Sequence, residues 1–155
     1  MHRPSYVGLV CLLVLLAAPA LGRDFSVDGL RVSEPWSRAT ASAGGTAAGY
    51  MAITNTGRAP DRLIAAACPV AQGTELHSEM AEAGVMRMRP VQEIALPPGQ
   101  TVRLAPDGLH LMLMGTKQKL TQGSSIGCTL TFEKAGRVDV TLAVGGPGAT
   151  APPGR

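Results

Sequence analysis

The sequence is poor in aromatic residues and has no cluster of basic charge. It has one Trp, two Tyr and two Phe among 155 residues, and its 14 lysines and arginines are scattered without a run. Nucleic-acid-binding domains gather basic residues on one face, and those that bind single strands add aromatic side chains. The composition therefore gives no support to nucleic-acid binding.

Long apolar stretches are scarce as well, and the one present lies at the N-terminus. His2 and Arg3 precede the apolar residues 7–18, which are too few to span a bilayer as a stable anchor. Small residues follow at Ala20 and Gly22. We expect a secretory signal peptide over residues 1–22, cleaved after Gly22, with cleavage after Ala20 as the alternative.

The rest of the chain is expected to lie outside the cytoplasm, in the periplasm or an equivalent compartment. It has no second apolar stretch long enough for a transmembrane helix, and loss of Arg3 with the leader lowers the formal net charge from +3 to +2. Cys11 lies inside the leader, but Gly8-Leu9-Val10 before it is a poor lipoprotein cleavage box, so we do not expect lipidation.

Cysteine is also rare, and no C-x-x-C motif is present. Outside the leader only Cys68 and Cys128 remain. An even pair in an oxidising compartment commonly forms a disulfide. The sequence does not establish that their Cα atoms approach within bonding distance, and copper ligation by a thiolate is the alternative.

The abundant residues favour strands over helices. The chain has 19 glycines and 12 prolines, which break long helices and punctuate many short segments. Short alternating segments with frequent turns predict one all-β domain over residues 23–144, an antiparallel β-sandwich of Greek-key type. Residues 145–155 are Gly, Pro and Ala without periodicity, and we expect them to be a disordered tail.

The most informative stretch runs from His77 to Met114. It holds five of the seven methionines and both histidines outside the leader. Met alternates with Arg over residues 85–89, and Leu alternates with His or Met over residues 110–114, which is the period of a strand with unlike faces. Met86 and Met88 should share one face. His110, Met112 and Met114 should share another, opposite the core side chains Leu111 and Leu113.

The first of these segments predicts a hairpin. A four-residue loop over Ala81–Gly84 pairs Met80 with Val85, which places His77 opposite Met88 and Glu79 opposite Met86. Directly opposed residues have Cβ atoms roughly 4.5–5.5 Å apart. We therefore expect one His/Met pair in the hairpin and a second, His110 and Met112, on a strand.

Two imidazoles and two thioethers form a neutral, soft donor set. Soft sulfur favours Cu(I) over Zn, Mg, Ca or Mn, and Glu79 is the only acid that the predicted hairpin places nearby. The pattern indicates a Cu(I) site. The alternative is a metal-free sandwich that acts by protein contact, with methionines that only fill space.

These residues resemble the PCuAC family of periplasmic copper chaperones. His77, ten residues, Met88, twenty-one residues, His110, one residue and Met112 reproduce the family motif without a gap. The similarity covers about residues 27–144. Its other matching segments are Trp36-Ser37-Arg38, Gly49-Tyr50-Met51, Ile53–Gly57, Gly84–Pro90, His110–Gly115 and Leu130–Gly136.

The resemblance implies a cupredoxin-like fold and a function. It implies that His77, Met88, His110 and Met112 bind Cu(I), with Met86 and Met114 as outer cover. The implied acceptor is the binuclear copper centre of cytochrome c oxidase, reached directly or through a Sco-type thiol protein. We expect a monomer. Some relatives have a His- or Met-rich tail that binds extra copper, which this chain lacks.

Two further readings are less well supported by the sequence. An electron-transfer cupredoxin needs a Cys thiolate with two His, and no His follows Cys128. An enzyme would need an open metal position or an acid–base pair, and Glu79 is the only acid near the predicted site. We therefore expect a protein that is not an enzyme.

Overall fold

The computed structural model describes residues 24–154, so the predicted signal peptide and Cys11 lie outside the described part. The described chain is all-β, which confirms the predicted class, and it has no helix long and apolar enough to span a bilayer. Its strands are β1 (Phe25–Val27), β2 (Leu30–Arg38), β3 (Ala47–Asn55), β4 (Asp61–Ala67), β5 (Ala71–Glu82), β6 (Val85–Pro90), β7 (Ile94–Leu96), β8 (Thr101–Leu104), β9 (Leu109–Thr116), β10 (Ser125–Phe132) and β11 (Gly136–Gly145).

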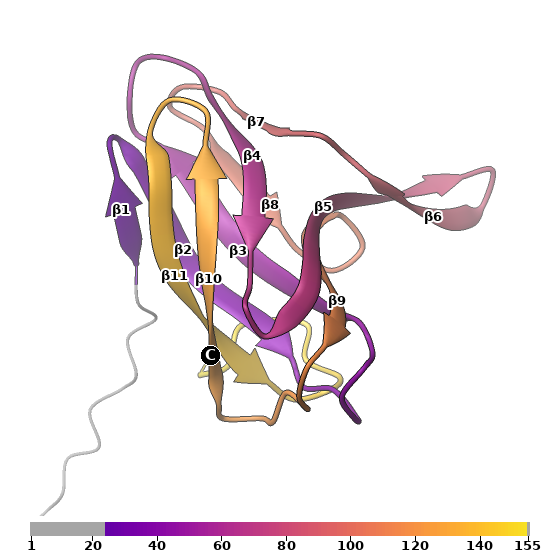
Figure 1. Ribbon diagram of the computed structural model, residues 1–155. Coiled ribbons are helices and arrows are strands. Elements are labelled where there is room, and N and C mark those ends of the chain that lie inside the picture. The colour runs from indigo at the N-terminus through magenta and orange to yellow at the C-terminus, as the bar shows by residue number, and fades with distance from the viewer. Residues whose placement is uncertain (1–23, 155) are drawn as a thin grey trace, which may run out of the picture.

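The strands form one continuous hydrogen-bonded sheet that folds over on itself. Its order is β6-β5-β9-β3-β2-β11-β10-β4-β7, with β1 on β2 and β8 on β3. All pairs are antiparallel except β11 with β2. Figure 1 shows β10 and β4 in front of β3, so that the sheet makes the two layers of a sandwich, while β6 extends beyond the body at one side.

Both layers contribute to a single apolar core. Ile53 of β3, Leu113 of β9, Leu130 of β10 and Leu142 of β11 are fully buried. Leu111 is fully buried too, which confirms the predicted core face of β9. Burial alternates along β10, and over residues 111–114 of β9, because successive side chains of a strand point to opposite faces.

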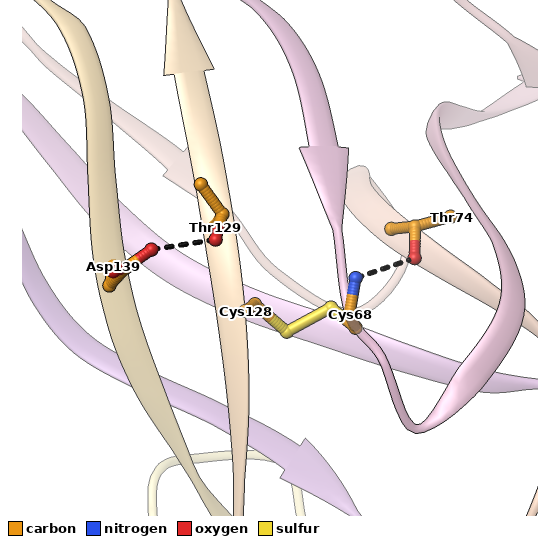
Figure 2. Close-up of a disulfide and its surroundings, with 5 residues drawn as sticks. All are labelled: Cys68, Thr74, Cys128, Thr129 and Asp139. Carbon is orange, nitrogen blue, oxygen red and sulfur yellow. Dashed lines mark hydrogen bonds between the residues drawn. A yellow bond between two sulfur atoms is a disulfide. The ribbon is translucent and has the colours of Figure 1, made fainter.

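A disulfide joins β10 to the end of β4, its neighbour in the same layer. Cys68 and Cys128 are bonded, with Cα atoms 4.2 Å apart and both side chains buried (Figure 2). The hydroxyl of Thr74 accepts a hydrogen bond of 3.1 Å from the Cys68 amide, as Figure 2 shows. The thiolate alternative for these two cysteines is wrong for this oxidised structure, because each sulfur is bonded to the other.

The C-terminal segment makes contacts with the body, and the disordered tail expected over residues 145–155 remains a prediction. Residues 146–154 follow β11 as a set of turns against the body, and Figure 1 shows them folding back at the end of the sandwich. The Ala149 carbonyl accepts a hydrogen bond of 2.7 Å from Nε of Arg38. Sequence periodicity misses such a segment because its contacts are made by turns and by a distant arginine.

Candidate metal centre

The pairing of β5 with β9 brings the two histidines together. His77 lies directly opposite His110 in this register, and their ring centroids are 5.8 Å apart. Met112 lies opposite Glu75 and shares the face of His110, as the alternation predicted. Residues far apart in the sequence thus meet through one antiparallel pair of strands.

The predicted hairpin register is wrong by two residues. β5 and β6 are joined by the two-residue turn Ala83-Gly84, in which both residues have positive φ, 50° and 80°. This is the backbone of a type I′ turn, whose twist suits a hairpin. Met88 therefore opposes Glu79, and Pro90 opposes His77.

The face of each hairpin residue is nevertheless as predicted. A shift of two residues keeps the pleat parity, so Met88 stays on the face of His77 as its diagonal neighbour. Diagonal positions are about 7–8 Å apart, within reach of a long side chain.

Three of the four predicted ligands line one pocket of about 460 Å³. Met88, His110 and Met112 contribute to its wall together with Tyr50 and Glu79. The remaining lining comes from Arg38, the loop between β2 and β3, the first two residues of β3, and Pro147 of the C-terminal segment. His77 completes the set through its contact with His110.

The four side chains differ in exposure. His110 is 3% exposed and Met112 is partly buried, whereas Met88, on the outermost strand of the sheet, is 46% exposed. His77 lies between these extremes, with 12% of its side chain exposed. The pocket therefore has a buried histidine on one side and an accessible thioether on the other.

Hydrogen bonds decide which ring nitrogen carries the proton in each histidine. Nδ1 of His110 lies 2.9 Å from the Gly108 carbonyl, and Nε2 of His77 lies 2.8 Å from a carboxylate oxygen of Glu75. Both oxygens only accept, so these nitrogens carry protons. The opposite nitrogens, Nδ1 of His77 and Nε2 of His110, are buried and have no hydrogen-bond partner among the described residues.

Unpartnered buried nitrogens of this kind fit a metal. Metal-binding histidines donate one ring N–H to a carboxylate or carbonyl and offer the other nitrogen as a ligand. Residues 24–154 contain no cluster of three or more His, Cys, Asp or Glu side chains that could hold a metal. Any metal bound here would therefore depend on the thioethers, which favours a soft ion.

Two aromatic rings, those of Tyr50 and Trp36, and the cation Arg38 lie near the histidines. The Tyr50 ring lies 6.4 Å from that of His110 and 4.7 Å from that of Trp36, between ring centroids. Burial raises the pKa of Tyr50, Arg38 opposes this, and Glu79 and Asp107 add to it. The Tyr50 phenol therefore stays neutral near pH 7 and contributes no charge to the site.

The structure adds residues that the sequence did not indicate. Glu79 was expected to be the only nearby acid, yet Glu75 holds His77, and Arg38 and Tyr50 line the pocket. The position of Glu75 two residues before His77, on the same face of a strand, was the available signal.

The two methionines expected to cover the site lie farther along their strands. Met114 lies over Gly73, where an added Cβ would be 3.3 Å from the methionine Cε. Met86 lies opposite Ala81 and is 48% exposed. Neither lines the pocket, and their covering role remains a prediction.

Comparisons with known proteins bear on this geometry. Residues 30–144 match the LpqE-like lipoprotein family. The chain is 32% identical over 139 residues to Lxx21020 of Leifsonia xyli subsp. xyli (strain CTCB07), which is named as a lipoprotein, covering 89% of this chain and 82% of the relative.

Solved structures of copper-binding proteins are also similar to this chain. The copper-bound PCuAC domain from PmoF2 is 30% identical, with a TM-score of 0.70 over 81% of this chain and 99% of that domain. The CuI form of DR1885 from Deinococcus radiodurans is 29% identical, with a TM-score of 0.52 over 83% of this chain and 85% of that protein. The chain therefore belongs to the LpqE-like family and has the cupredoxin-like fold of a PCuAC domain, as the resemblance implied.

Proposed function

We propose that this chain is an extracytoplasmic Cu(I) chaperone that binds one copper ion through His77, Met88, His110 and Met112. One observation carries the proposal: two adjacent histidines offer unpartnered ring nitrogens beside a pocket lined by two thioethers. The copper-bound state of the PmoF2 domain and the CuI state of DR1885 support the choice of metal.

The uneven exposure of the four side chains suits transfer. Met88 is accessible on the outer strand, whereas His110 is buried. An incoming sulfur ligand of an acceptor can approach at Met88, bind copper and replace the donors one at a time, so that copper is never free. Met86, next on the same face, and Met114 would limit the access of water.

The acceptor belongs to the same proposal. We propose delivery to the binuclear copper centre of cytochrome c oxidase, directly or through a Sco-type thiol protein, by a monomeric chaperone. The motif residues support this through their resemblance to PCuAC chaperones. The disulfide between Cys68 and Cys128 leaves the described residues without a thiolate for a blue-copper site, which weighs against electron transfer.

The proposed location is extracytoplasmic. It rests on the leader expected over residues 1–22, with the functional domain over 23–144, and on the lipoprotein names of the family and of Lxx21020. The residues before Cys11 do not form the cleavage sequence of a lipoprotein, so we propose cleavage near Gly22. A secreted protein cleaved near Gly22 and a lipoprotein anchored at Cys11 would both have this domain outside the cytoplasm.

The test is anaerobic titration of residues 23–155 with Cu(I) against a competing chelator. The wild type should bind one copper tightly, and the His110→Ala, Met112→Ala double variant should lose that binding. Met80→Ala is the matched control, because Met80 is 62% exposed on the other face of the hairpin.

Two outcomes would contradict the proposal. Equal binding by the wild type and the double variant would put copper elsewhere. Absence of binding by every protein would favour the metal-free sandwich. Where binding is confirmed, mixing the loaded protein with the apo copper-centre domain, or with a reduced Sco-type protein, tests the acceptor by the absorbance of the loaded centre.

A further inference from the structure

We propose that Glu75 is a positioning residue, which holds the ring of His77 in one tautomer and so presents Nδ1 to the metal. The inference rests on the proposed copper site and deepens it. Glu75 lies outside the four-residue ligand motif. It precedes His77 by two residues and lies on the same face of β5.

The contact between the two side chains is direct. An oxygen of the Glu75 carboxylate lies 2.8 Å from Nε2 of His77. A carboxylate accepts and does not donate, so Nε2 carries the proton. The lone pair of the neutral ring is then on Nδ1, the atom that is buried without a partner.

The opposite tautomer would be unfavourable in this environment. It would place an N–H at the buried Nδ1, where the described residues provide no acceptor, and it would turn a nitrogen lone pair towards the Glu75 oxygen. A buried donor left unsatisfied costs about 1–3 kcal/mol. Glu75 therefore favours the form of His77 that is ready to bind a metal.

The two histidines are positioned by different kinds of group. His110 donates from Nδ1 to the backbone carbonyl of Gly108, which no substitution at that position removes. His77 depends on a side chain. The structure thus predicts ligation through Nε2 of His110 and Nδ1 of His77, and only the second arrangement can be abolished by a point mutation of its partner.

A purely structural role for Glu75 would have a different signature. Its side chain is 47% exposed, and exposed charge pairs contribute little to stability. Loss of Glu75 should therefore leave folding almost unchanged. The readouts that distinguish positioning from folding are the tautomer of His77 in the apoprotein and the Cu(I) affinity.

The experiment compares wild type, Glu75→Ala, Glu75→Gln and Glu82→Gln as residues 23–155. The imidazole ¹⁵N chemical shifts of the apoproteins report the tautomers, and anaerobic chelator competition reports Cu(I) affinity. Glu82→Gln is the matched control, because it removes the same charge from the same strand, while Glu82 does not line the pocket and its carboxylate accepts a hydrogen bond from Arg89 instead.

The expected pattern is specific to His77. Wild type and Glu82→Gln should show the Nε2–H tautomer of His77 and equal affinities. Glu75→Ala should populate the Nδ1–H form and bind Cu(I) about 10–100-fold more weakly, the usual effect of losing such a partner. Glu75→Gln retains an acceptor oxygen and should lie between, while the shifts of His110 stay constant.

Three results decide the matter. An unchanged His77 tautomer in folded Glu75→Ala would overturn the inference. A changed tautomer with unchanged Cu(I) affinity would show that His77 does not bind through Nδ1, which also overturns it. Failure of the wild type to bind Cu(I) would overturn the proposed function instead, and the ¹⁵N shifts would still decide whether Glu75 sets the ring of His77.

Discussion

His110 and Met88 line the same pocket, yet their exposed fractions are 3% and 46%. His110 is packed beside the Tyr50 ring in the interior, whereas Met88 lies on the outermost strand. A buried side chain contributes to folding as well as to binding, and an exposed one contributes little to folding. The two proposed ligands should therefore respond differently to truncation.

We predict that Met88→Ala weakens Cu(I) binding and leaves apoprotein stability within about 0.5 kcal/mol of wild type. His110→Ala should weaken binding and also destabilise the apoprotein by roughly 1–3 kcal/mol, because it leaves a buried cavity. Denaturant unfolding and chelator competition measure the two effects. Equal destabilisation by both substitutions would contradict the assigned environments.

At the scale of elements, the β5–β6 hairpin extends beyond the body of the sandwich (Figure 1), and Met88 belongs to its second strand. Its register depends on the turn at Ala83-Gly84, where Ala83 has a φ of 50°. A left-handed conformation costs a residue with a Cβ about 1–2 kcal/mol, and Asn tolerates it better. The turn is therefore a weak point of the hairpin.

We predict that Ala83→Asn stabilises the hairpin, because Asn-Gly is a favoured type I′ sequence. Amide hydrogen exchange in β6 should slow, and Cu(I) affinity should stay equal or rise. Ala81→Asn, a strand position of the same hairpin, is the control and should not slow exchange. Faster exchange in the Ala83 variant would argue against the two-residue turn.

A second link between elements joins the start of β4 to the turn after β10. The carboxylate of Asp61 accepts backbone hydrogen bonds from Arg62 at 2.7 Å, Lys134 at 3.0 Å and Ala135 at 2.9 Å. Burial alone would raise the pKa of Asp61, but these three bonds outweigh it and hold the pKa below its usual value.

The sign of the pH dependence follows from this depression. Asp61 contributes stability that is fully present above the unfolded pKa of about 3.9 and is lost as the pH falls through the lower folded pKa. We predict that Asp61→Asn destabilises the protein at pH 7 by roughly 1–3 kcal/mol, since an amide replaces a charged acceptor.

The difference between Asp61→Asn and wild type should begin to shrink as the pH falls below about 4, where Asp61 of the unfolded wild type takes up a proton, and it should vanish only below the lower folded pKa. Urea unfolding at pH 7 and pH 3 measures this. Asp24→Asn serves as the control, because Asp24 is exposed and lies 3.9 Å from Arg31. A constant difference across this pH range would contradict the lowered pKa.

At the scale of the whole molecule, the disulfide ties β10 to the end of its neighbour β4 and joins two cysteines that are 60 residues apart in sequence. Cys68 lies just before the turn into β5, the strand that carries Glu75 and His77. Closing a loop of this length stabilises a fold by about 4 kcal/mol in the chain-entropy account. The cross-link therefore supports the framework that holds the site.

We predict that the Cys68→Ala, Cys128→Ala double variant loses roughly 2–4 kcal/mol of stability but still binds one Cu(I) per chain at low temperature, because neither sulfur is a ligand. Thermal unfolding and chelator competition test the two parts. Loss of copper binding by a variant that remains folded would show that a cysteine takes part.

The sequence by itself determined the class of fold and the face of its strand on which each proposed donor lies. Those features follow from strand alternation, which is local: a side chain's face depends only on parity, and parity survived the two-residue error in the hairpin register. The fully buried Leu111 and Leu113 opposite His110 and Met112 follow from the same rule.

Only the tertiary structure decided which residues are neighbours. The pairing of β5 with β9 sets His77 against His110, and it could not be read from spacing because many strand pairings satisfy the same alternation. The contact between Arg38 and the Ala149 carbonyl likewise joins residues that are far apart in the sequence, and it depends on turns that carry residues 146–154 back to the body. Local pattern thus defines what each strand can present, and long-range pairing defines what those side chains meet.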